Sequence, residues 1–237
     1  IKAVKDKNAD IGIALDGDGD RLGVVDSEGK IIFPDRYLAL MASEILKKNK
    51  SRKIVYDIKC SNQLGQVIKE NNGTPIMTKT GHSYIKSEIS KSNAILGGEM
   101  SGHIFYNDNW YGFDDGIFAA LKLLEILSSK ESTTHEVFNK FTQLFNTPEI
   151  KIAVEDDEKF EIVEQLKVKL KPEGYNSILI DGLRLENKDC WGLVRASNTT
   201  PSLILRFEAN TEQKLMEIQE LFQKTLFEIS TNLKFLN

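Results

Sequence analysis

The middle of the chain reads KIVYDI (53–58), NQLGQVIKE (62–70), TPIMT (74–78), SYIKSEISKS (83–92) and AIL (94–96). The short segments are apolar and rich in isoleucine, valine and threonine, which favour strands, whereas the longer ones carry apolar residues at helical spacing. Strands that alternate with helices are typical of a mostly parallel sheet covered by helices on both faces. We therefore predict a three-layer α/β domain whose ligands bind where strands end and loops begin.

The same alternation extends over residues 31–145, which we assign to this domain. Pro34 begins a helix that runs to Asn49, with its apolar residues on one face. A short strand at 103–106 leads to a long helix at 115–128. The α/β pattern therefore continues up to residue 145, where the composition changes.

Beyond residue 145 the strands and helices are grouped instead of alternating. A strand at 149–154 and a helix at 159–170 precede four further strands, and a final helix follows Thr211, which is a suitable N-cap. The four strands span 177–180, 183–185, 191–196 and 203–209. This layout is typical of an α+β architecture. We predict a second, smaller α+β domain over residues 146–237.

Residues 1–30 precede the α/β pattern and form a separate part of the chain. We predict strands at 11–15 and 22–26, followed by a turn at 27–30. Two strands need more of a sheet than these residues supply, and the sequence begins with isoleucine. We therefore expect residues 1–30 to be the C-terminal remnant of a domain that begins upstream, in a longer protein.

The overall composition argues against several classes of function. A net charge of −4 and a pI of about 5.6 give no support to a nucleic-acid partner. No apolar run approaches the roughly 20 residues that span a membrane, so we expect no membrane partner. Cys60 and Cys190 lie far apart without metal-ligand spacing, and no targeting pattern is present. These features favour reduced thiols and a cytoplasmic location.

The stretch DGDGDR (16–21) carries three carboxylates at alternate positions. Alternate side chains of an extended chain point the same way, so Asp16, Asp18 and Asp20 can converge on one point. Such carboxylates repel one another unless a cation lies among them, which predicts a hard divalent metal bound through oxygen. A run of Asp-Gly hairpin turns is the alternative. A calcium EF-hand fails, because its loop requires glycine at position six and glutamate at position twelve.

The stretch GGEMSGH (97–103) lies between two predicted strands and carries Glu99, Ser101 and His103 at alternate positions. A carboxylate, a hydroxyl and an imidazole suit the binding of vicinal sugar hydroxyls, and the histidine is available for proton transfer. The alternative for this stretch is an ordinary polar turn. The alternative for any single lysine or histidine at a strand end is a solvated surface residue without a role in binding. Other strand ends of the domain add Lys59 and, within KTGHS (79–83), His82.

The stretch RASNTTP (195–201) lies in a loop between two strands of the α+β domain. Its arginine offers a bidentate fork to a phosphate, and its hydroxyls and turning backbone N–H groups can bind the remaining oxygens. An Asn-Thr turn closed by proline is the alternative. A metal loop, a polyol-binding loop and a phosphate-binding loop together predict a phosphorylated sugar as the common ligand.

These stretches occur together in one known family. Over essentially its whole length, the chain resembles the α-D-phosphohexomutase superfamily. The motifs that carry the resemblance are DGDGDR (16–21), KTGHS (79–83), GEMSGH (98–103), GFDDG (112–116) and RASNTTP (195–201), in the family's order. The combination of GEMSGH with RASNTTP is most similar to the branch of bacterial phosphomannomutases/phosphoglucomutases. Specificity for phosphoglucosamine is the alternative within the superfamily.

The resemblance implies an isomerase that moves phosphate between C1 and C6 of a hexose through a phosphoserine and a hexose 1,6-bisphosphate. It implies that Asp16, Asp18 and Asp20 hold Mg²⁺, whose fourth protein ligand is an oxygen of the phosphoserine. Arg21 would then lie against that phosphate as a catalytic residue. The fold that it implies is a three-layer α/β phosphohexomutase domain followed by a smaller α+β C-terminal domain.

The other motifs receive implied roles in binding the phosphorylated hexose. Glu99 and Ser101 would read the sugar hydroxyls in two opposite orientations, and His103 would be the candidate proton carrier. Lys59 and His82 would line the same cleft. The non-reacting phosphate would be clamped by Arg195, Ser197, Asn198 and Thr199.

One departure from the family pattern is large. Family members carry the nucleophilic serine in a T-A-S-H-N-P-type loop, and this chain contains no such segment. We therefore expect the C-terminal part of such an enzyme, which alone binds phosphosugar weakly, does not turn over and leaves its metal site empty or weakly occupied. A phosphatase that uses Asp16 as its nucleophile is disfavoured, because it requires an Asp-x-Asp-x-Thr/Val type run.

Overall fold

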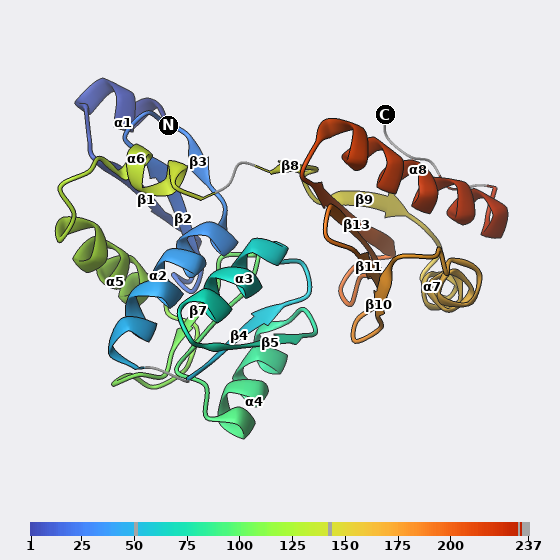
Figure 1. Ribbon diagram of the computed structural model, residues 1–237, viewed down its shortest axis with the longest axis horizontal. Coiled ribbons are helices and arrows are strands. Elements are labelled where there is room, and N and C mark those ends of the chain that lie inside the picture. The colour runs from blue at the N-terminus through green and yellow to red at the C-terminus, as the bar shows by residue number, and fades with distance from the viewer. Residues whose placement is uncertain (50–51, 142–143, 232, 234–237) are drawn as a thin grey trace. The chain divides into compact units, whose positions relative to one another are not determined.

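The computed structural model describes residues 1–49, 52–141, 144–231 and 233. The chain divides into two compact units, residues 1–142 and 143–237. Each unit has its own hydrophobic core, and each is described by itself (Figure 1).

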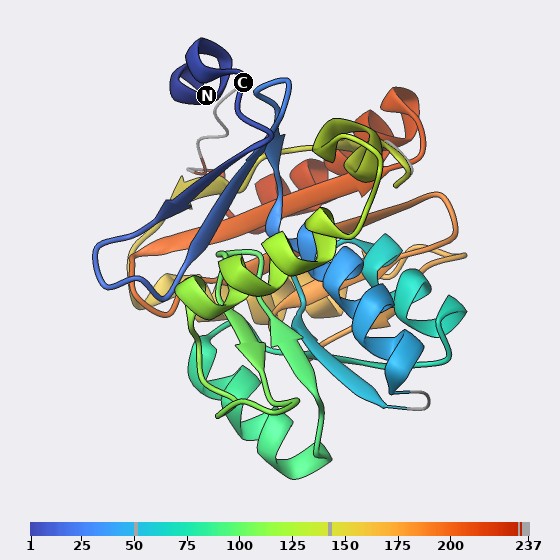
Figure 2. The same ribbon diagram turned by 90° about the vertical axis from the view of Figure 1, so that its left-hand side faces the viewer.

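The first unit begins with helix α1 (Lys2–Lys7) and a small antiparallel sheet. Its strands are β1 (Ile11–Leu15), β2 (Leu22–Asp26) and β3 (Ile31–Ile32), in the order β1-β2-β3. Figure 2 shows β1 and β2 as neighbouring blue arrows. The two strands predicted from the sequence are confirmed, whereas β3 was not expected. It has only two residues, because Phe33 and Pro34 follow at once and start a helix.

The α/β layers of the first unit are built on a four-stranded sheet in the order β5-β4-β6-β7. The strands are β4 (Lys53–Asp57), β5 (Thr74–Thr78), β6 (Leu96–Gly98) and β7 (Ile104–Tyr106). β4 pairs in parallel with β5 and with β6, and β7 is antiparallel to β6. The sheet is therefore mostly parallel, as predicted.

Helices cover both faces of this sheet, which confirms the three-layer prediction. α2 (Pro34–Lys48), α3 (Asn62–Glu70) and α5 (Gly116–Ser128) pack on one face, against Ile54 and Tyr56 of β4. α4 (His82–Ser92) packs on the other face, where Ile85 and Ile89 contact Val55. Successive residues of β4 thus point into different layers.

Two differences from the prediction in the first unit have a clear cause. β6 begins at Leu96 instead of Ala94, because the backbone N–H of Ala94 still caps α4 through the carbonyl of Ile89. A short helix, α6 (Thr134–Asn139), was missed although Thr133 and Glu136 form a capping box at its start. Six residues are too few for helical periodicity to be recognised.

Glu44 of α2 ties that helix to the segment between α5 and α6. Its carboxylate accepts hydrogen bonds from Lys130 (2.7 Å) and Lys47 (2.8 Å). Burial raises the pKa of Glu44, but the hydrogen bonds and charges of Lys130 and Lys47 outweigh that effect and hold the pKa below its ordinary value. The ionised form is therefore favoured by folding.

We expect Glu44→Gln to lower the free energy of unfolding by up to about 1 kcal/mol at neutral pH. A carboxyl whose pKa is depressed by folding stabilises above its unfolded pKa and loses that contribution as the pH falls through its folded pKa. Urea unfolding at neutral and acidic pH should therefore show a difference that vanishes in acid. Glu131→Gln, at an exposed position, is the control. A pH-independent difference would contradict this assignment.

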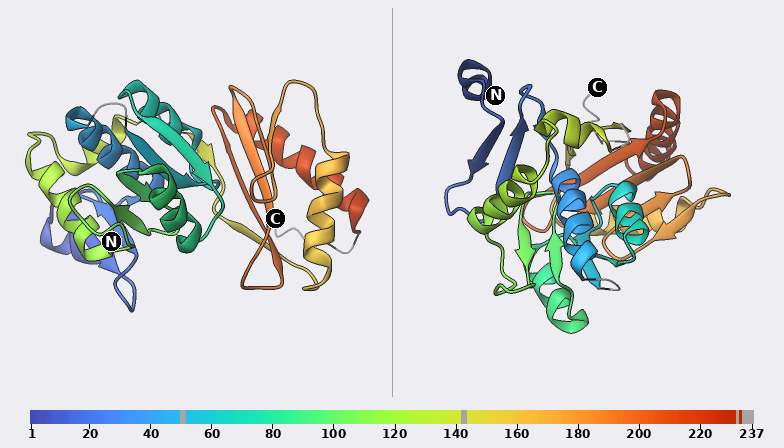
Figure 3. Two further views of the ribbon diagram at one scale, coloured as in Figure 1. Left: turned by 90° about the horizontal axis from the view of Figure 1, so that it is seen from below. Right: turned by 60° about the vertical axis from the view of Figure 1, so that its left-hand side comes forward.

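The second unit is a mainly antiparallel sheet with two helices. The strands lie in the order β10-β11-β12-β13-β8, and β9 also pairs with β13. They are β8 (Phe145–Asn146), β9 (Ile150–Ala153), β10 (Asn176–Ile178), β11 (Leu183–Glu186), β12 (Cys190–Ala196) and β13 (Ser202–Ala209). The helices α7 (Glu158–Lys169) and α8 (Glu212–Ile229) pack on one face of the sheet (Figure 3, left). The predicted α+β architecture is confirmed, and Thr211 is the N-cap of α8.

In the part of the chain that the structure describes, none of the helices has both the length and the apolar character needed to cross a lipid bilayer.

Candidate functional site

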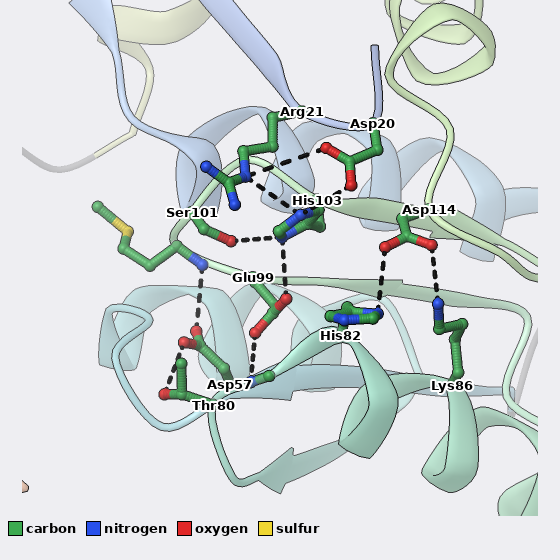
Figure 4. A network of polar contacts seen from close by, with 12 residues as sticks. Asp20, Arg21, Asp57, Thr80, His82, Lys86, Glu99, Ser101, His103 and Asp114 are labelled. Atoms are coloured by element: carbon green, nitrogen blue, oxygen red, sulfur yellow. Dashed lines mark hydrogen bonds and ion pairs between the residues drawn. The ribbon is translucent and has the colours of Figure 1, made fainter. Parts of the chain in front are cut away.

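Three loops meet at one edge of the parallel sheet of the first unit. They follow β4, β5 and β6 and span residues 58–61, 79–81 and 99–103. The carboxyl ends of neighbouring parallel strands lie at the same edge of a sheet, so these loops come together. Figure 4 shows polar side chains from two of these loops, namely Thr80 and the group Glu99, Ser101 and His103. The segment 99–103 is called the Glu99 loop below.

Residues 16–21, called the aspartate loop below, are joined to this edge by backbone contacts. The amide of Leu22 donates to the carbonyl of Gly102 (3.0 Å), and Arg21 forms a β-bridge with His103. Gly102 has a φ of +101°, and a Cβ there would lie 2.9 Å from the carbonyl oxygen of Leu22. Glycine therefore allows the two loops to approach this closely.

The three carboxylates of the aspartate loop lie together. Ligand oxygens of Asp16, Asp18 and Asp20 are all within 4.8 Å of one another. One oxygen of Asp20, Oδ1, is buried and accepts no hydrogen bond from the described residues. A buried acceptor without a donor, beside two further carboxylates, fits the coordination of a hard divalent cation.

Arg21 partly balances the charge of these carboxylates. Its amide donates to Asp16 Oδ1 (3.2 Å), and its Nε lies 3.5 Å from Asp16 Oδ2. Desolvation raises the pKa of Asp16, but the hydrogen bond from the Arg21 amide and the Arg21 charge bring it below its ordinary value. Asp16 is therefore ready to bind a cation in its ionised form.

His103 lies between the aspartate loop and the Glu99 loop, and it is buried. Its Nδ1 is 3.0 Å from Glu99 Oε2 and 2.7 Å from the hydroxyl of Ser101. Its Nε2 accepts from Arg21 Nε (3.2 Å) and is 3.4 Å from Asp20 Oδ2. A proton on Nδ1, shared with the Glu99 carboxylate, leaves Nε2 as an acceptor on the side of the aspartate loop.

The surroundings of His103 suit a group that gains and loses a proton. Burial lowers its pKa, but the hydrogen bond to Glu99 and the charges of Glu99 and Asp20 together raise the pKa above its ordinary value. The Arg21 charge opposes this rise. Folding therefore favours the protonated form of His103 relative to a free imidazole.

His82, at the start of α4, lies beside His103, and the centroids of the two rings are 6.0 Å apart. Its Nδ1 is 3.6 Å from Asp114, which also receives a hydrogen bond from Lys86 (3.0 Å). Ligand atoms of Asp20, His103 and Asp114 lie within 4.8 Å of one another. Sequence reasoning gave Asp114 and Lys86 no role, although GFDDG (112–116) was singled out as a motif.

Lys59 is not the solvated surface group that a single lysine at a strand end commonly is. It is only 7% exposed. Burial and the charge of Glu99 raise the pKa of the neighbouring Asp57 above its ordinary value, although the charge of Lys59 lowers it. Asp57, the last residue of β4, was also missed from the sequence, because it lies inside a predicted strand.

In the second unit, the Arg195 loop comprises residues 195–201, which are the last two residues of β12 and the connection from β12 to β13. The hydroxyl of Ser197 accepts hydrogen bonds from the amides of Thr199 (3.4 Å) and Thr200 (3.1 Å). The amide of Ser197 donates to the carbonyl of Ser202 (2.9 Å). These bonds close the loop into a tight turn, in which Asn198 and Thr199 are exposed.

Two residues that the sequence did not single out hold the Arg195 loop. Asp181 accepts a hydrogen bond from Arg195 Nε (2.8 Å), which orients the guanidinium group. Lys159 of α7 donates to the carbonyl of Thr200 (3.3 Å) and to Asp156. The predicted anion-binding groups are thus carried by an internally bonded loop.

Two family models match the chain. The phosphoglucomutase/phosphomannomutase alpha/beta/alpha domain III matches residues 33–145, and the phosphoglucomutase/phosphomannomutase C-terminal domain matches residues 149–224.

Similar proteins carry related names. A phosphomannomutase/phosphoglucomutase of Pseudomonas syringae is 48% identical over 98% of this chain and 50% of its own length. A phosphoglucomutase of Neisseria meningitidis serogroup A is 48% identical over 98% of this chain and 51% of its own length. The crystal structure of a phosphoglucomutase/phosphomannomutase family protein from Burkholderia thailandensis has a TM-score of 0.92 and 42% identity, and covers 99% of this chain and 50% of that one. The chain thus spans about half the length of these relatives.

Proposed function

The chain belongs to the phosphoglucomutase/phosphomannomutase family, and from this premise we propose that it supplies the sugar- and phosphate-binding part of an enzyme that interconverts hexose 1-phosphate and hexose 6-phosphate. The observation that carries the proposal is the contact between the aspartate loop and the Glu99 loop through His103. It joins a cation-binding group to a polyol-binding group through a residue that can carry a proton.

The proposed reaction transfers a phosphoryl group twice. A free hydroxyl of the substrate attacks a phosphoryl group carried by the enzyme as phosphoserine, which gives a hexose 1,6-bisphosphate. After this intermediate turns over, its other phosphoryl group returns to the serine and the isomeric monophosphate leaves. This chain contains no segment like the serine loop of the family, so the proposal assigns it binding and proton transfer only.

Asp16, Asp18 and Asp20 are the residues that would hold Mg²⁺ in this enzyme. When bound, the ion would neutralise negative charge on the transferred phosphoryl group. Arg21 lies beside the same carboxylates and can bind the phosphate oxygens. The buried oxygen of Asp20, which accepts no hydrogen bond from the described residues, supports this assignment.

His103 is the candidate general base and acid. With its Nδ1 proton held by Glu99, Nε2 can accept the proton of the attacking hydroxyl and return it to the leaving oxygen in the second transfer. Glu99 and Ser101 would contact the sugar hydroxyls. Lys59, on the loop after β4, and His82, the first residue of α4, lie at the same edge. A sugar held by its ring hydroxyls can present either C1 or C6 for reaction.

The Arg195 loop is the candidate site for the phosphate that does not react. Arg195, Ser197, Asn198 and Thr199 combine a guanidinium fork with hydroxyl, amide and backbone donors, which are the groups that bind phosphate. Binding energy from a remote phosphate is available to orient the reacting end of the substrate.

The proposal predicts that this chain alone binds hexose phosphates but does not interconvert them. Binding is measured by NMR titration with glucose 6-phosphate, with unphosphorylated glucose as the control ligand. Turnover is measured by ³¹P NMR with mannose 1-phosphate or glucose 1-phosphate and a hexose 1,6-bisphosphate as activator. Equal binding of glucose and glucose 6-phosphate would contradict the phosphate site. Turnover by the chain alone would contradict the division of roles.

A further inference from the structure

Asp57 occupies a central position under the candidate site. It is the last residue of β4, which lies between β5 and β6 in the sheet. Its side chain is completely buried, with 0% exposure. Among the carboxylates of this edge it therefore lies beneath the loops and is not placed to touch a ligand.

Each oxygen of Asp57 is engaged by groups from the loops above it. Oδ1 accepts from the thiol of Cys60 (3.1 Å) and from the amide of Met100 (3.2 Å). Oδ2 accepts from the hydroxyl of Thr80 (3.1 Å). Figure 4 shows the carboxylate between Thr80 and the Glu99 loop. One side chain thus connects the loops that follow β4, β5 and β6.

The three donors determine what kind of group can fill this position. A carboxylate accepts hydrogen bonds at both oxygens, whereas an amide of the same shape accepts at one and donates at the other. The thiol, the N–H and the hydroxyl all point toward Asp57 as donors. An ionised carboxylate satisfies all of them. Burial and the charge of Glu99 raise the pKa of Asp57 above its ordinary value, and the charge of Lys59 opposes that rise.

The loops that Asp57 connects carry or directly precede the groups assigned to the sugar. Lys59 lies two residues after Asp57, His82 two residues after Thr80, and Ser101 follows Met100. Glu99 joins two of these loops a second time, because its Oε1 accepts from the amide of Gly81 (2.6 Å). The spacing of the binding groups thus depends on a carboxylate that none of them needs for its own chemistry.

We propose that Asp57 is a positioning residue that fixes the spacing of the three sugar-binding loops. The inference rests on the proposed function for the identity of the ligand, but the contacts that carry it are independent of that function. It predicts that removing hydrogen bonds of the Asp57 carboxylate moves His82 and His103. The affinity of the chain for a hexose phosphate should then fall.

The chain offers a matched control. Asp26 is also a buried carboxylate of the first unit, and it accepts hydrogen bonds from the amides of Glu28 and Lys30 and contacts His135 (2.8 Å). It is the last residue of β2, and these three partners lie outside the three loops. The chain has three histidines, so ring NMR signals report on both places at once: His82 and His103 on the site, and His135 on the control.

The experiment compares Asp57→Asn with Asp26→Asn by histidine ring NMR, urea unfolding and titration with glucose 6-phosphate. We expect Asp57→Asn to shift the ring signals of His82 and His103 and to weaken glucose 6-phosphate binding about tenfold, as for one lost charged hydrogen bond. Asp26→Asn should shift His135, lower stability and leave affinity within about twofold.

Thr80 keeps the test decisive if Asp57→Asn does not fold. Thr80→Val removes one donor to Asp57 at nearly constant volume, and Thr80→Ser restores it. We expect Thr80→Val to shift the ring signals of His82 and weaken binding by about threefold to fivefold, with recovery in Thr80→Ser. Folded Asp57 and Thr80 variants with unchanged signals would overturn the proposal. If the unsubstituted chain does not bind glucose 6-phosphate, the proposed function is contradicted. The positioning role of Asp57 is then tested by the histidine ring signals of the variants alone.

Discussion

Asp20→Asn is expected to weaken binding of Mg²⁺ to the chain by about 100-fold, because it removes one unit of charge from a cluster of three carboxylates at direct contact range. The substitution keeps the volume of the side chain. Asp20 is chosen because its buried Oδ1 accepts no hydrogen bond from the described residues. The asparagine side chain places either its amide oxygen or its N–H₂ group at the position of Oδ1. Neither group carries the negative charge of the carboxylate.

The effect on stability should depend on the ion. Without Mg²⁺, the carboxylates of the aspartate loop lie within 4.8 Å of one another and repel, so Asp20→Asn is expected to leave the unfolding temperature unchanged or higher. With Mg²⁺ at ten times its dissociation constant, the unsubstituted chain should gain about 1.4 kcal/mol of unfolding free energy by mass action. The variant should gain almost none.

Thermal unfolding with and without Mg²⁺ measures this difference, and line broadening by Mn²⁺ in NMR spectra locates the ion independently of stability. Asp6→Asn is the matched control, since Asp6 is an exposed carboxylate of α1. An Asp20→Asn variant that Mg²⁺ stabilises as much as the unsubstituted chain would remove Asp20 from the metal site.

The aspartate loop and the Glu99 loop could be predicted from the sequence, because each motif lies within a few consecutive residues. In the aspartate loop and the Glu99 loop, alternate residues of one short segment face the same way, so the spacing alone brings the side chains together. The contact between the two loops could not be predicted in this way. Arg21 and His103 are 82 positions apart in the sequence, and no periodicity connects them.

The supporting residues were missed for a similar reason. In the sequence, Asp57 is indistinguishable from other strand residues and Asp181 from other turn residues. Their hydrogen-bond partners come close only in the folded chain. Lys159 is one of many lysines, and its bond to the carbonyl of Thr200 spans 41 positions. Composition and spacing thus identify functional residues that lie close together in the sequence. Residues that support such a motif from distant positions are identified only from the tertiary structure.

The extension of β6 to Gly98 has a packing reason that strand propensity does not reveal. Gly97 and Gly98 are poor strand formers, yet both pair with β4. A Cβ on Gly97 would lie 2.8 Å from Ile89 of α4, and one on Gly98 would lie 2.6 Å from Leu38 of α2. Glycine at these positions lets helices pack closely on both faces of the sheet, directly before the Glu99 loop.

Arg195→Ala is expected to weaken binding of hexose phosphates by about 30- to 150-fold, or 2–3 kcal/mol, which is the range for a lost charge-assisted hydrogen bond. The guanidinium group is oriented by Asp181 at 2.8 Å, so its donors are held in place before a phosphate arrives. Alanine removes the donors and leaves the Asp181 carboxylate without this partner, which adds repulsion toward an anionic ligand.

NMR titration with glucose 6-phosphate measures the loss, and Lys171→Ala is the control, because it removes an exposed positive charge from the same unit. Arg195→Lys separates charge from geometry: lysine keeps the charge but lacks the planar fork, so most of the affinity should still be lost. If Arg195→Ala and Lys171→Ala weaken binding equally, the attraction is a general effect of charge. If only the substitutions at position 195 weaken binding, and Arg195→Lys restores little of the affinity, the phosphate is bound by the planar, bidentate guanidinium group.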